Sequence, residues 1–200
     1  MRKILQQKED SAILRNTTRE VPIKDITSAK VKKILKEMSE ALGSQEDGVA
    51  IAAPQIGYPL SIFVVSGKVF DQNFLEGRKI RYSGKDAARR SGQEGDPDIS
   101  AISAVSRSKK FPKDLIFINP KISKLSREKA WVPEGCLSVR WLYGMVQRSK
   151  KATITAYDEN GKKFTRGASG LLAQIFQHET DHLQGVLFID KAKEVKEELP

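Results

Sequence analysis

Two histidines four residues apart, in the stretch QHETDHLQG at residues 177–185, constrain this chain more than any other feature of its sequence. They are its only histidines, and Glu179 follows the first of them. A chance pair at this spacing with an acidic residue after it has odds of roughly one in a thousand. Residues four apart share one helix face, so His178 and His182 can present two imidazole nitrogens to a single ion. The stretch therefore predicts a metal-binding helix.

The residues before the histidines place the pair on the buried side of that helix. Leu171 and Ile175 continue the same apolar stripe toward the N-terminus. We predict that the helix begins near Ala168 and ends at Gly185, because glycine commonly terminates a helix. A pair of hydrogen-bonded core histidines is the alternative interpretation, and the rarity of the arrangement counts against it.

Cys136, the only cysteine, is the leading candidate for a third metal ligand. Catalytic metal sites commonly use three protein ligands and leave one position open for water, and a thiolate suits a ferrous or zinc ion. The residues PEG before it predict a tight turn, and LSV after it predicts an extended run with free amide donors. A small buried hydrophobic residue is the other interpretation of a lone cysteine. A single cysteine also excludes an intrachain disulfide, which favours a reducing compartment.

Helix and strand patterns predict an α+β fold. Apolar residues recur at helical spacing in TSAKVKKILKEMSEALGSQ, where Thr27 or Ser28 can cap the start and Gly43 the end. Strand-like runs occupy residues 61–65, 115–119 and 152–157, and the last leads through DENG into KKFT as a hairpin. Strands and helices do not alternate regularly, which is why we predict α+β rather than a βαβ series. The final stretch, KAKEVKEELP, is predicted to be an exposed helical or frayed tail.

Length and charge bound the remaining possibilities. A chain of 200 residues can bury one core without disulfides or a structural metal, so we predict a single domain over residues 1–200. Residues 66–113 are polar and carry eleven Lys/Arg against six Asp/Glu, half of the net charge of +10, and we predict a surface insertion there. Neither a signal peptide nor a membrane span is apparent, so a cytoplasmic protein is expected. The positive charge favours polyanions as partners.

Three segments resemble the motifs of the peptide deformylases, in the order of that family. They are GVAIAAPQIG at residues 48–57, EGCLSV at 134–139 and QHETDHLQG at 177–185. The third motif alone is shared with metalloproteases, whereas the three together are highly specific. The resemblance implies a compact α+β domain in which short antiparallel sheets pack around a central metal-binding helix. It also implies a hydrolase of protein biosynthesis that removes the N-formyl group from nascent formyl-methionyl peptides and releases formate.

The resemblance also implies roles for individual residues. Cys136, His178 and His182 would hold one divalent ion, which is ferrous iron in many members and can be zinc, nickel or cobalt. The ion would lower the pKa of its bound water toward ~7, giving a hydroxide that attacks the formyl carbon with Glu179 as general base. Gln55 and the backbone N–H of Leu137 would donate hydrogen bonds to the developing oxyanion.

The first motif is expected to bind the substrate. Gly48 and Ala50 are small, so an extended peptide can approach the chain closely and pair with it, while Val49 and Ile51 can face an apolar pocket for the methionine side chain. Ala50 stands where the family most often has glycine, which puts the substrate preference in doubt. The segment RWLYGMV after Val139 also differs from the sequence that is common in the family. In this segment, Arg140, Trp141 and Tyr143 can line the entrance for the peptide, and packing in the core is the alternative for Trp141.

Two other functions compete with this interpretation. A zincin-like peptidase would use a downstream third ligand, and the residues after His182 offer only the carboxylates of Glu194, Glu197 and Glu198. A basic RNA-binding or ribosome-binding module would bind with an affinity that falls steeply with salt. For the deformylase interpretation we expect a monomer that contacts the ribosome transiently and does not bind a membrane.

Overall fold

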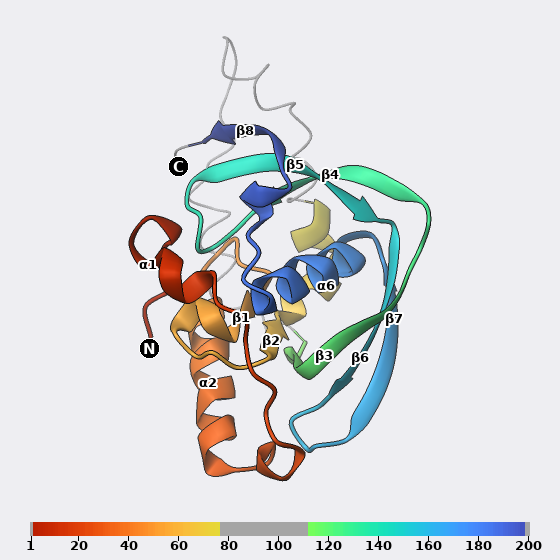
Figure 1. Cartoon of the computed structure of the whole chain (residues 1–200). Coiled ribbons are helices and arrows are strands. Elements are labelled where there is room, and N and C mark those ends of the chain that lie inside the picture. The colour runs from red at the N-terminus through yellow and green to blue at the C-terminus, as the bar shows by residue number, and fades with distance from the viewer. Residues whose placement is uncertain (1, 77–111, 199–200) are drawn as a thin grey trace. The chain divides into compact units, whose positions relative to one another are not determined.

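The computed structural model describes residues 2–76 and 112–198 (Figure 1). Residues Met1–Ser66 and Asp114–Pro200 form one compact unit, and Gly67–Lys113 form a second. The first unit contains every element discussed below. Most of the predicted insertion, residues 77–111, lies outside the described residues, so that prediction stays a prediction.

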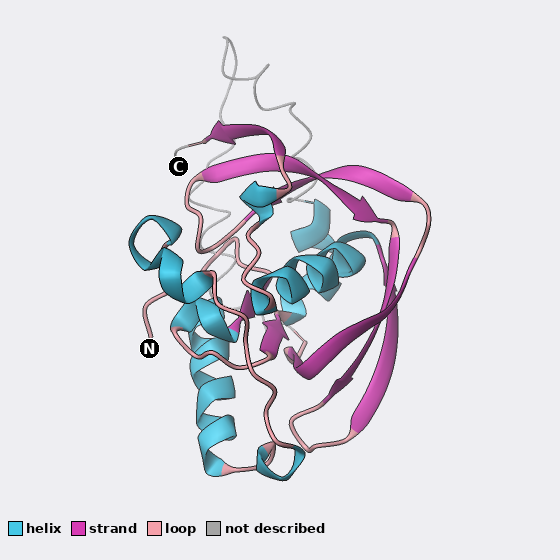
Figure 2. Ribbon diagram, viewed as in Figure 1, coloured by secondary structure: helices cyan, strands magenta, loops and turns pink. Residues whose placement is uncertain are grey.

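Among the described residues, the first unit combines three α-helices, three short 3-10 helices and eight strands, coloured by type in Figure 2. Its α-helices are α1 (Gln7–Leu14), α2 (Ala29–Gly43) and α6 (Gly170–Leu183). The 3-10 helices of this unit are η1 (Ile23–Asp25), η2 (Ala53–Ile56) and η4 (Phe188–Asp190), and η3 (Gly67–Phe70) belongs to the second unit. The strands are β1 (Ala50–Ala52), β2 (Ile62–Val65), β3 (Leu115–Leu125), β4 (Lys129–Gly135), β5 (Leu142–Ser149), β6 (Lys151–Tyr157), β7 (Lys163–Ser169) and β8 (Lys193–Glu197).

The strands form two sheets that both contact α6. One sheet has the order β1-β2-β3-β6-β7 and the other β4-β5-β8, and all pairings between these named strands are antiparallel. Helix α6 contacts strands of both sheets, as its place in Figure 1 shows. The predicted α+β fold, with antiparallel sheets around the histidine helix, is therefore confirmed.

Helix α2 follows from its apolar pattern and its cap. Ser28, one of the two predicted caps, accepts a hydrogen bond at its side-chain oxygen from the backbone N–H of Val31 at 3.3 Å. The helix ends at Gly43, as predicted. Its buried face packs in one hydrophobic cluster with residues of β1, β2 and η2. Because η2 carries Gln55, this packing fixes one side of the site described below.

Three buried phenylalanines attach α6 to the five-stranded sheet. The rings of Phe63 on β2 and Phe117 on β3 stack with centroids 4.6 Å apart. Phe176 on α6 meets Phe117 edge-on at 5.1 Å and lies 6.3 Å from Phe63. Burying each of these rings stabilises the fold by roughly 1.5–3 kcal/mol. The face of α6 that bears the histidines is thereby held in one orientation.

The prediction for the C-terminal stretch was wrong, whereas the histidine helix begins close to where it was predicted. Residues 193–197 form strand β8 rather than a helical or frayed tail, because they pair with the edge of β5. Lys and Glu have low strand propensity, and here pairing to an existing strand overrides it. Helix α6 begins at Gly170, two residues after the predicted start, since β7 continues through Ser169. No helix among residues 2–76 and 112–198 has the length and apolar content that crossing a membrane requires.

Replacing Gly185 with alanine is expected to lower the free energy of unfolding by about 2 kcal/mol, because a side chain at this position would strain the backbone and collide with a neighbouring segment. Gly185 ends the histidine helix with a φ of +73°, and a Cβ there would lie 2.1 Å from the backbone oxygen of Arg15. Equilibrium urea unfolding measures the change. The matched control is Gly43→Ala, since a Cβ at Gly43 meets nothing within 4 Å. Equal stability of the two variants would contradict this account.

Candidate metal centre

Helix α6 and the residue after β4 bring three potential metal ligands together. The rings of His178 and His182 have centroids 4.9 Å apart and planes inclined by 73°. Cys136 follows directly after β4, and its Sγ lies 3.2 Å from Nε2 of His182. One ligand atom from each of the three residues lies within 4.8 Å of the others. The predicted ligands thus converge on a volume of the size that one ion needs.

The chain reaches Cys136 differently from the prediction. PEG does not form a turn, because Pro133–Gly135 pair with Met145–Tyr143 of β5 and continue β4. The turn falls instead on Leu137 and Ser138, where an extended run was predicted. Cross-strand pairing, which is invisible to local turn propensity, decides this segment. A Cβ at Gly135 would lie 2.6 Å from Cε1 of Tyr143, so glycine lets that ring cross the strand just before the cysteine.

A buried charged network supports His178. The Nδ1 atom of its ring lies 3.0 Å from Oε2 of Glu134. Both carboxylate oxygens of Glu134 accept hydrogen bonds from Arg148, at 2.8 and 2.9 Å. Arg148 also donates to Oδ2 of Asp181 at 2.6 Å. Because Nδ1 is engaged by Glu134, the ring is oriented with Nε2 available to an ion.

The same contacts shift the pKa values of the network. Burial would raise the pKa of Glu134, but its hydrogen bonds to Arg148 and His178 outweigh burial and lower the pKa to about 2. Burial alone would lower the pKa of His178, but hydrogen bonds to Cys136 and Glu134 outweigh burial, and the pKa lies well above its usual value. Burial and the neighbouring His178 depress the pKa of His182. These contacts therefore favour the charged form of Glu134 beside the ligands at neutral pH.

Glu179 lies within the same buried region and is only 4% exposed. Burial raises the pKa of its carboxyl to about 7. Among the described residues, neither Oε2 of Glu179 nor Nδ1 of His182 has a hydrogen-bond partner. A buried carboxylate oxygen without a partner is costly unless it serves a ligand. A cation held by the three ligands would lower the pKa of Glu179 again, so the donor set, the charge of Glu134 and this free oxygen all fit a divalent ion.

Gln55 is fixed beside the cluster by its own side chain. Its Oε1 accepts a hydrogen bond from the backbone N–H of Ala52 at 2.7 Å. Its Nε2 donates to Oγ of Ser138 at 3.1 Å and lies 3.5 Å from Sγ of Cys136. Gln55 is 2% exposed, so its amide is shielded from solvent beside the ligand cluster. Leu137, the other predicted oxyanion donor, is adjacent to Cys136 in the chain and is buried.

The first motif forms an edge of the five-stranded sheet. Strand β1, which contains Ala50 and Ile51, pairs only with β2 among the strands of its sheet. Ile51 is fully buried in the hydrophobic cluster with α2, and Val49 is half-buried. A Cβ at Gly48 would lie 3.0 Å from Leu42 and Gln45, so the chain approaches α2 closely there. The substrate-binding roles of these residues stay predictions.

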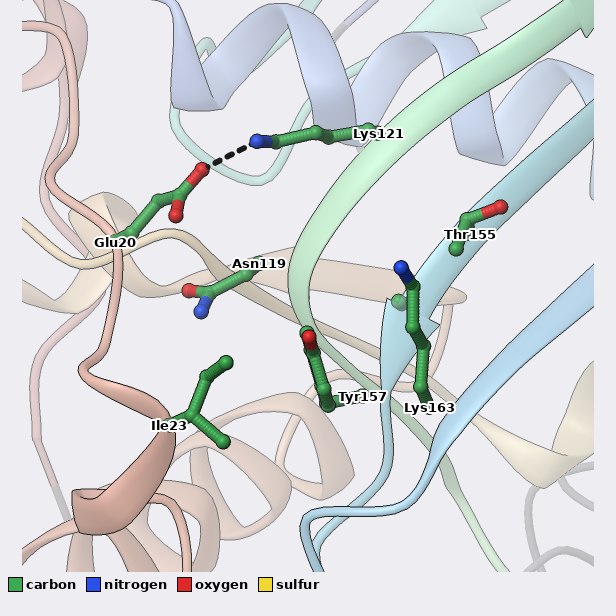
Figure 3. A pocket seen from close by; sticks show the side chains of 8 residues that line it. Glu20, Ile23, Asn119, Lys121, Thr155, Tyr157 and Lys163 are labelled. Carbon is green, nitrogen blue, oxygen red and sulfur yellow. Dashed lines mark ion pairs between the residues drawn. The ribbon is translucent and has the colours of Figure 1, made fainter.

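Other parts of the described chain do not join this site. The glutamates that a peptidase would need, Glu194, Glu197 and Glu198, are exposed at or beside β8 and are not part of the ligand cluster. Figure 3 shows a pocket near β3 and β6 in which Lys121 forms an ion pair with Glu20 at 2.7 Å. None of the predicted site residues lines this pocket.

The sequence interpretation missed three residues of the site, Glu134, Arg148 and Asp181. Glu134 and Asp181 lie within the second and third motifs, two residues from Cys136 and one from His182, and that closeness to a ligand was a usable signal. No local signal marks Arg148, because it comes from β5 and meets the two acids only through the tertiary fold.

Comparisons with known proteins agree with this arrangement. The Polypeptide deformylase family matches residues 1–198. The chain is 33% identical to Peptide deformylase 2 of Clostridium acetobutylicum, and the match covers 92% of each chain. It is 35% identical to chloroplastic Peptide deformylase 1A of Solanum lycopersicum over 92% of its own length, and it spans 57% of the length of that relative. The crystal structure of a peptide deformylase from Legionella pneumophila is 28% identical and has a TM-score of 0.67, with 97% of this chain and 87% of that chain covered.

Proposed function

This chain belongs to the polypeptide deformylase family, and from that premise we propose that it is a metal-dependent hydrolase acting on nascent polypeptides. The reaction would remove the N-formyl group from the N-terminal formyl-methionine and release formate. The observation that carries the proposal is the convergence of Cys136, His178 and His182 within 4.8 Å, with the buried Glu179 one residue from the first histidine.

Cys136, His178 and His182 would hold one divalent ion, with ferrous iron as our choice and zinc, nickel or cobalt as substitutes. When bound, such an ion lowers the pKa of a coordinated water from far above neutrality toward ~7 and polarises an amide carbonyl. The chain's own contribution is to fix the ligands beforehand. Glu134 holds the ring of His178 through Nδ1, and Arg148 holds Glu134.

Glu179 would act as the general base. Its free Oε2 can accept a proton from the attacking water and then deliver it to the departing nitrogen of the peptide. Burial raises the pKa of this carboxyl and a bound cation would lower it, so the two effects oppose each other at the proposed base. Burial also keeps bulk water away from the transfer.

Gln55 and Leu137 would stabilise the oxyanion that forms on the formyl oxygen. The Gln55 amide is held by Ala52 and Ser138, and the N–H that faces Sγ of Cys136 in a long contact would be the one that turns to the developing charge. The peptide itself would pair along the free edge of β1, next to Gly48, Val49 and Ala50, with Ile51 in the wall behind it. Tyr143, which crosses Gly135, would border the entrance.

The setting of the enzyme is also part of the proposal. We expect one catalytic domain over residues 1–200 with an insertion at about 66–113, a monomeric state and a cytoplasmic location. A transient contact with the ribosome would place the site near emerging chains, in keeping with the net charge of +10.

Formate release tests the proposed function directly. The protein would be purified anaerobically, loaded with ferrous iron or nickel, and supplied with formyl-Met-Ala-Ser. We expect formate to be released by the loaded protein, lost on chelation and regained on reloading. No formate from fully loaded protein would refute a deformylase, and cleavage of internal peptide bonds would favour the peptidase alternative.

Metal binding should also raise the free energy of unfolding of the protein. At a free nickel concentration one hundred times the Kd, we expect the ion to stabilise the native state by about 2.7 kcal/mol, because it binds the folded ligand set and not the unfolded chain. Thermal unfolding with and without nickel measures this. Cys136→Ala, which removes one ligand, should show a much smaller increase at the same nickel concentration. An equal increase in both proteins would mean that nickel binds elsewhere.

A further inference from the structure

The segment before α1 joins the two sides of the site. The backbone N–H of Leu5 donates to the carbonyl oxygen of Gln55 at 2.8 Å. Two residues later, the backbone N–H of Gln7 donates to the carbonyl oxygen of Ser138 at 2.7 Å. One short segment is therefore hydrogen-bonded both to the turn that carries Gln55 and to the turn that follows Cys136.

Gln6 lies between these two contacts, and its side chain does not cap the helix that follows it. It occupies the N-cap position of α1, where Ser, Thr, Asn and Asp are preferred, and its side chain makes no cap hydrogen bond. Its backbone N–H is satisfied by Oδ2 of Asp10 at 3.0 Å. Its side-chain Nε2 instead donates to the carbonyl oxygen of Leu137 at 3.1 Å, and also to that of Ile4 at 3.3 Å.

The carbonyl of Leu137 belongs to the same planar peptide group as the N–H of Ser138. That N–H points at Sγ of Cys136, 3.4 Å away. A donor on the carbonyl side fixes the plane of this peptide and polarises its N–H, which strengthens the bond to sulfur. A single amide thus sets how the turn presents a hydrogen bond to the sulfur of the candidate ligand.

We propose that Gln6 is a positioning residue that acts through the Leu137–Ser138 peptide on the sulfur of Cys136. The inference rests on the proposed function for its catalytic consequence, although its effect on the sulfur is independent of turnover. An N–H bond to a ligating thiolate draws electron density from sulfur and so modulates how strongly it donates to the ion. Loss of the Gln6 amide leaves all three ligands in place but alters this donation.

The test compares three variants of the full chain. Gln6→Met keeps the length of the side chain and removes the donor, whereas Gln6→Lys keeps an N–H donor at its end. Lys3→Met is the matched control, because Lys3 lies in the same segment and pairs only with Glu9 on the surface at 3.2 Å in the described contacts. Each protein is loaded with cobalt(II), and the sulfur-to-cobalt charge-transfer absorption is recorded beside kcat and KM for formyl-Met-Ala-Ser.

For Gln6→Met we expect kcat to fall about three- to tenfold with little change in KM, and the charge-transfer band to move to longer wavelength because sulfur becomes a stronger donor. Gln6→Lys should restore both properties in large part, and Lys3→Met should match wild type. An unmoved band in folded Gln6→Met would overturn the inference, even if kcat fell.

Two further results keep the inference separate from its premise. If Gln6→Met does not fold, Gln6→Glu, which is isosteric and lacks the donor, replaces it with the same expected band shift. If wild type releases no formate, the proposed function fails, whereas the band comparison still decides whether Gln6 acts on the sulfur.

Discussion

Glu179→Gln is expected to lower kcat for formate release by about 10²–10⁴-fold while the metal content stays unchanged. Glutamine has the shape of glutamate but cannot accept a proton from water. The carboxyl is buried and its Oε2 has no partner among the described residues, so no neighbouring group there is placed to take over the proton. Because the base acts in the chemical step, KM should change much less than kcat.

Single-turnover formate release and metal analysis of the same sample measure both halves of this expectation. Glu197→Gln is the control, since Glu197 is exposed on β8 and the same chemical change there should leave kcat near that of wild type. A Glu179→Gln protein that retains its ion and more than a tenth of the wild-type kcat would show that another group moves the proton.

Arg148→Met is expected to lower the free energy of unfolding by about 3–5 kcal/mol, the cost of leaving buried charge uncompensated. Arg148 is 5% exposed, and its guanidinium donates to both oxygens of Glu134 and to Asp181. Without it, two carboxylates remain close together in a poorly solvated region and repel each other. Since Glu134 orients His178, metal affinity should fall in the same variant.

Urea unfolding of the metal-free proteins isolates the effect on stability. Lys191→Met is the matched control: Lys191 also pairs with Asp181, at 2.7 Å, but its side chain is 43% exposed to solvent. Removing such an exposed pair typically costs ~0–1 kcal/mol. The argument about burial would be wrong if the two variants lost similar amounts of stability.

The parts of the fold that could be predicted from sequence are those determined by neighbouring residues. The apolar period of α2 and its Ser28 cap are local, and the hairpin of β6 and β7 follows from alternation around DENG. The parts that could not be predicted depend on pairing across the chain. Strand β4 passes through a proline and a glycine because β5 provides its partner, and β8 is a strand for the same reason.

The candidate site divides along the same line. The spacing of His178 and His182 made the two ligands visible, and the geometry brings Cys136 to them although the turn lies elsewhere than predicted. The residues that hold the ligands in place could not be predicted from the sequence. Arg148 and Gln6 come from segments with no resemblance to a site motif, and their relevance exists only once the chain is folded.

The stacked phenylalanines under α6 have a consequence for how the protein acquires its ion. They hold the helix against the sheet through contacts that involve none of the three candidate ligands, so we expect both histidines to be in place before an ion binds. Folding and metal loading are then separate events, unlike in a zinc finger. A site with one thiolate and two imidazoles suits several divalent cations, and we expect the supply of metals in the cell at the time of loading to select the occupant.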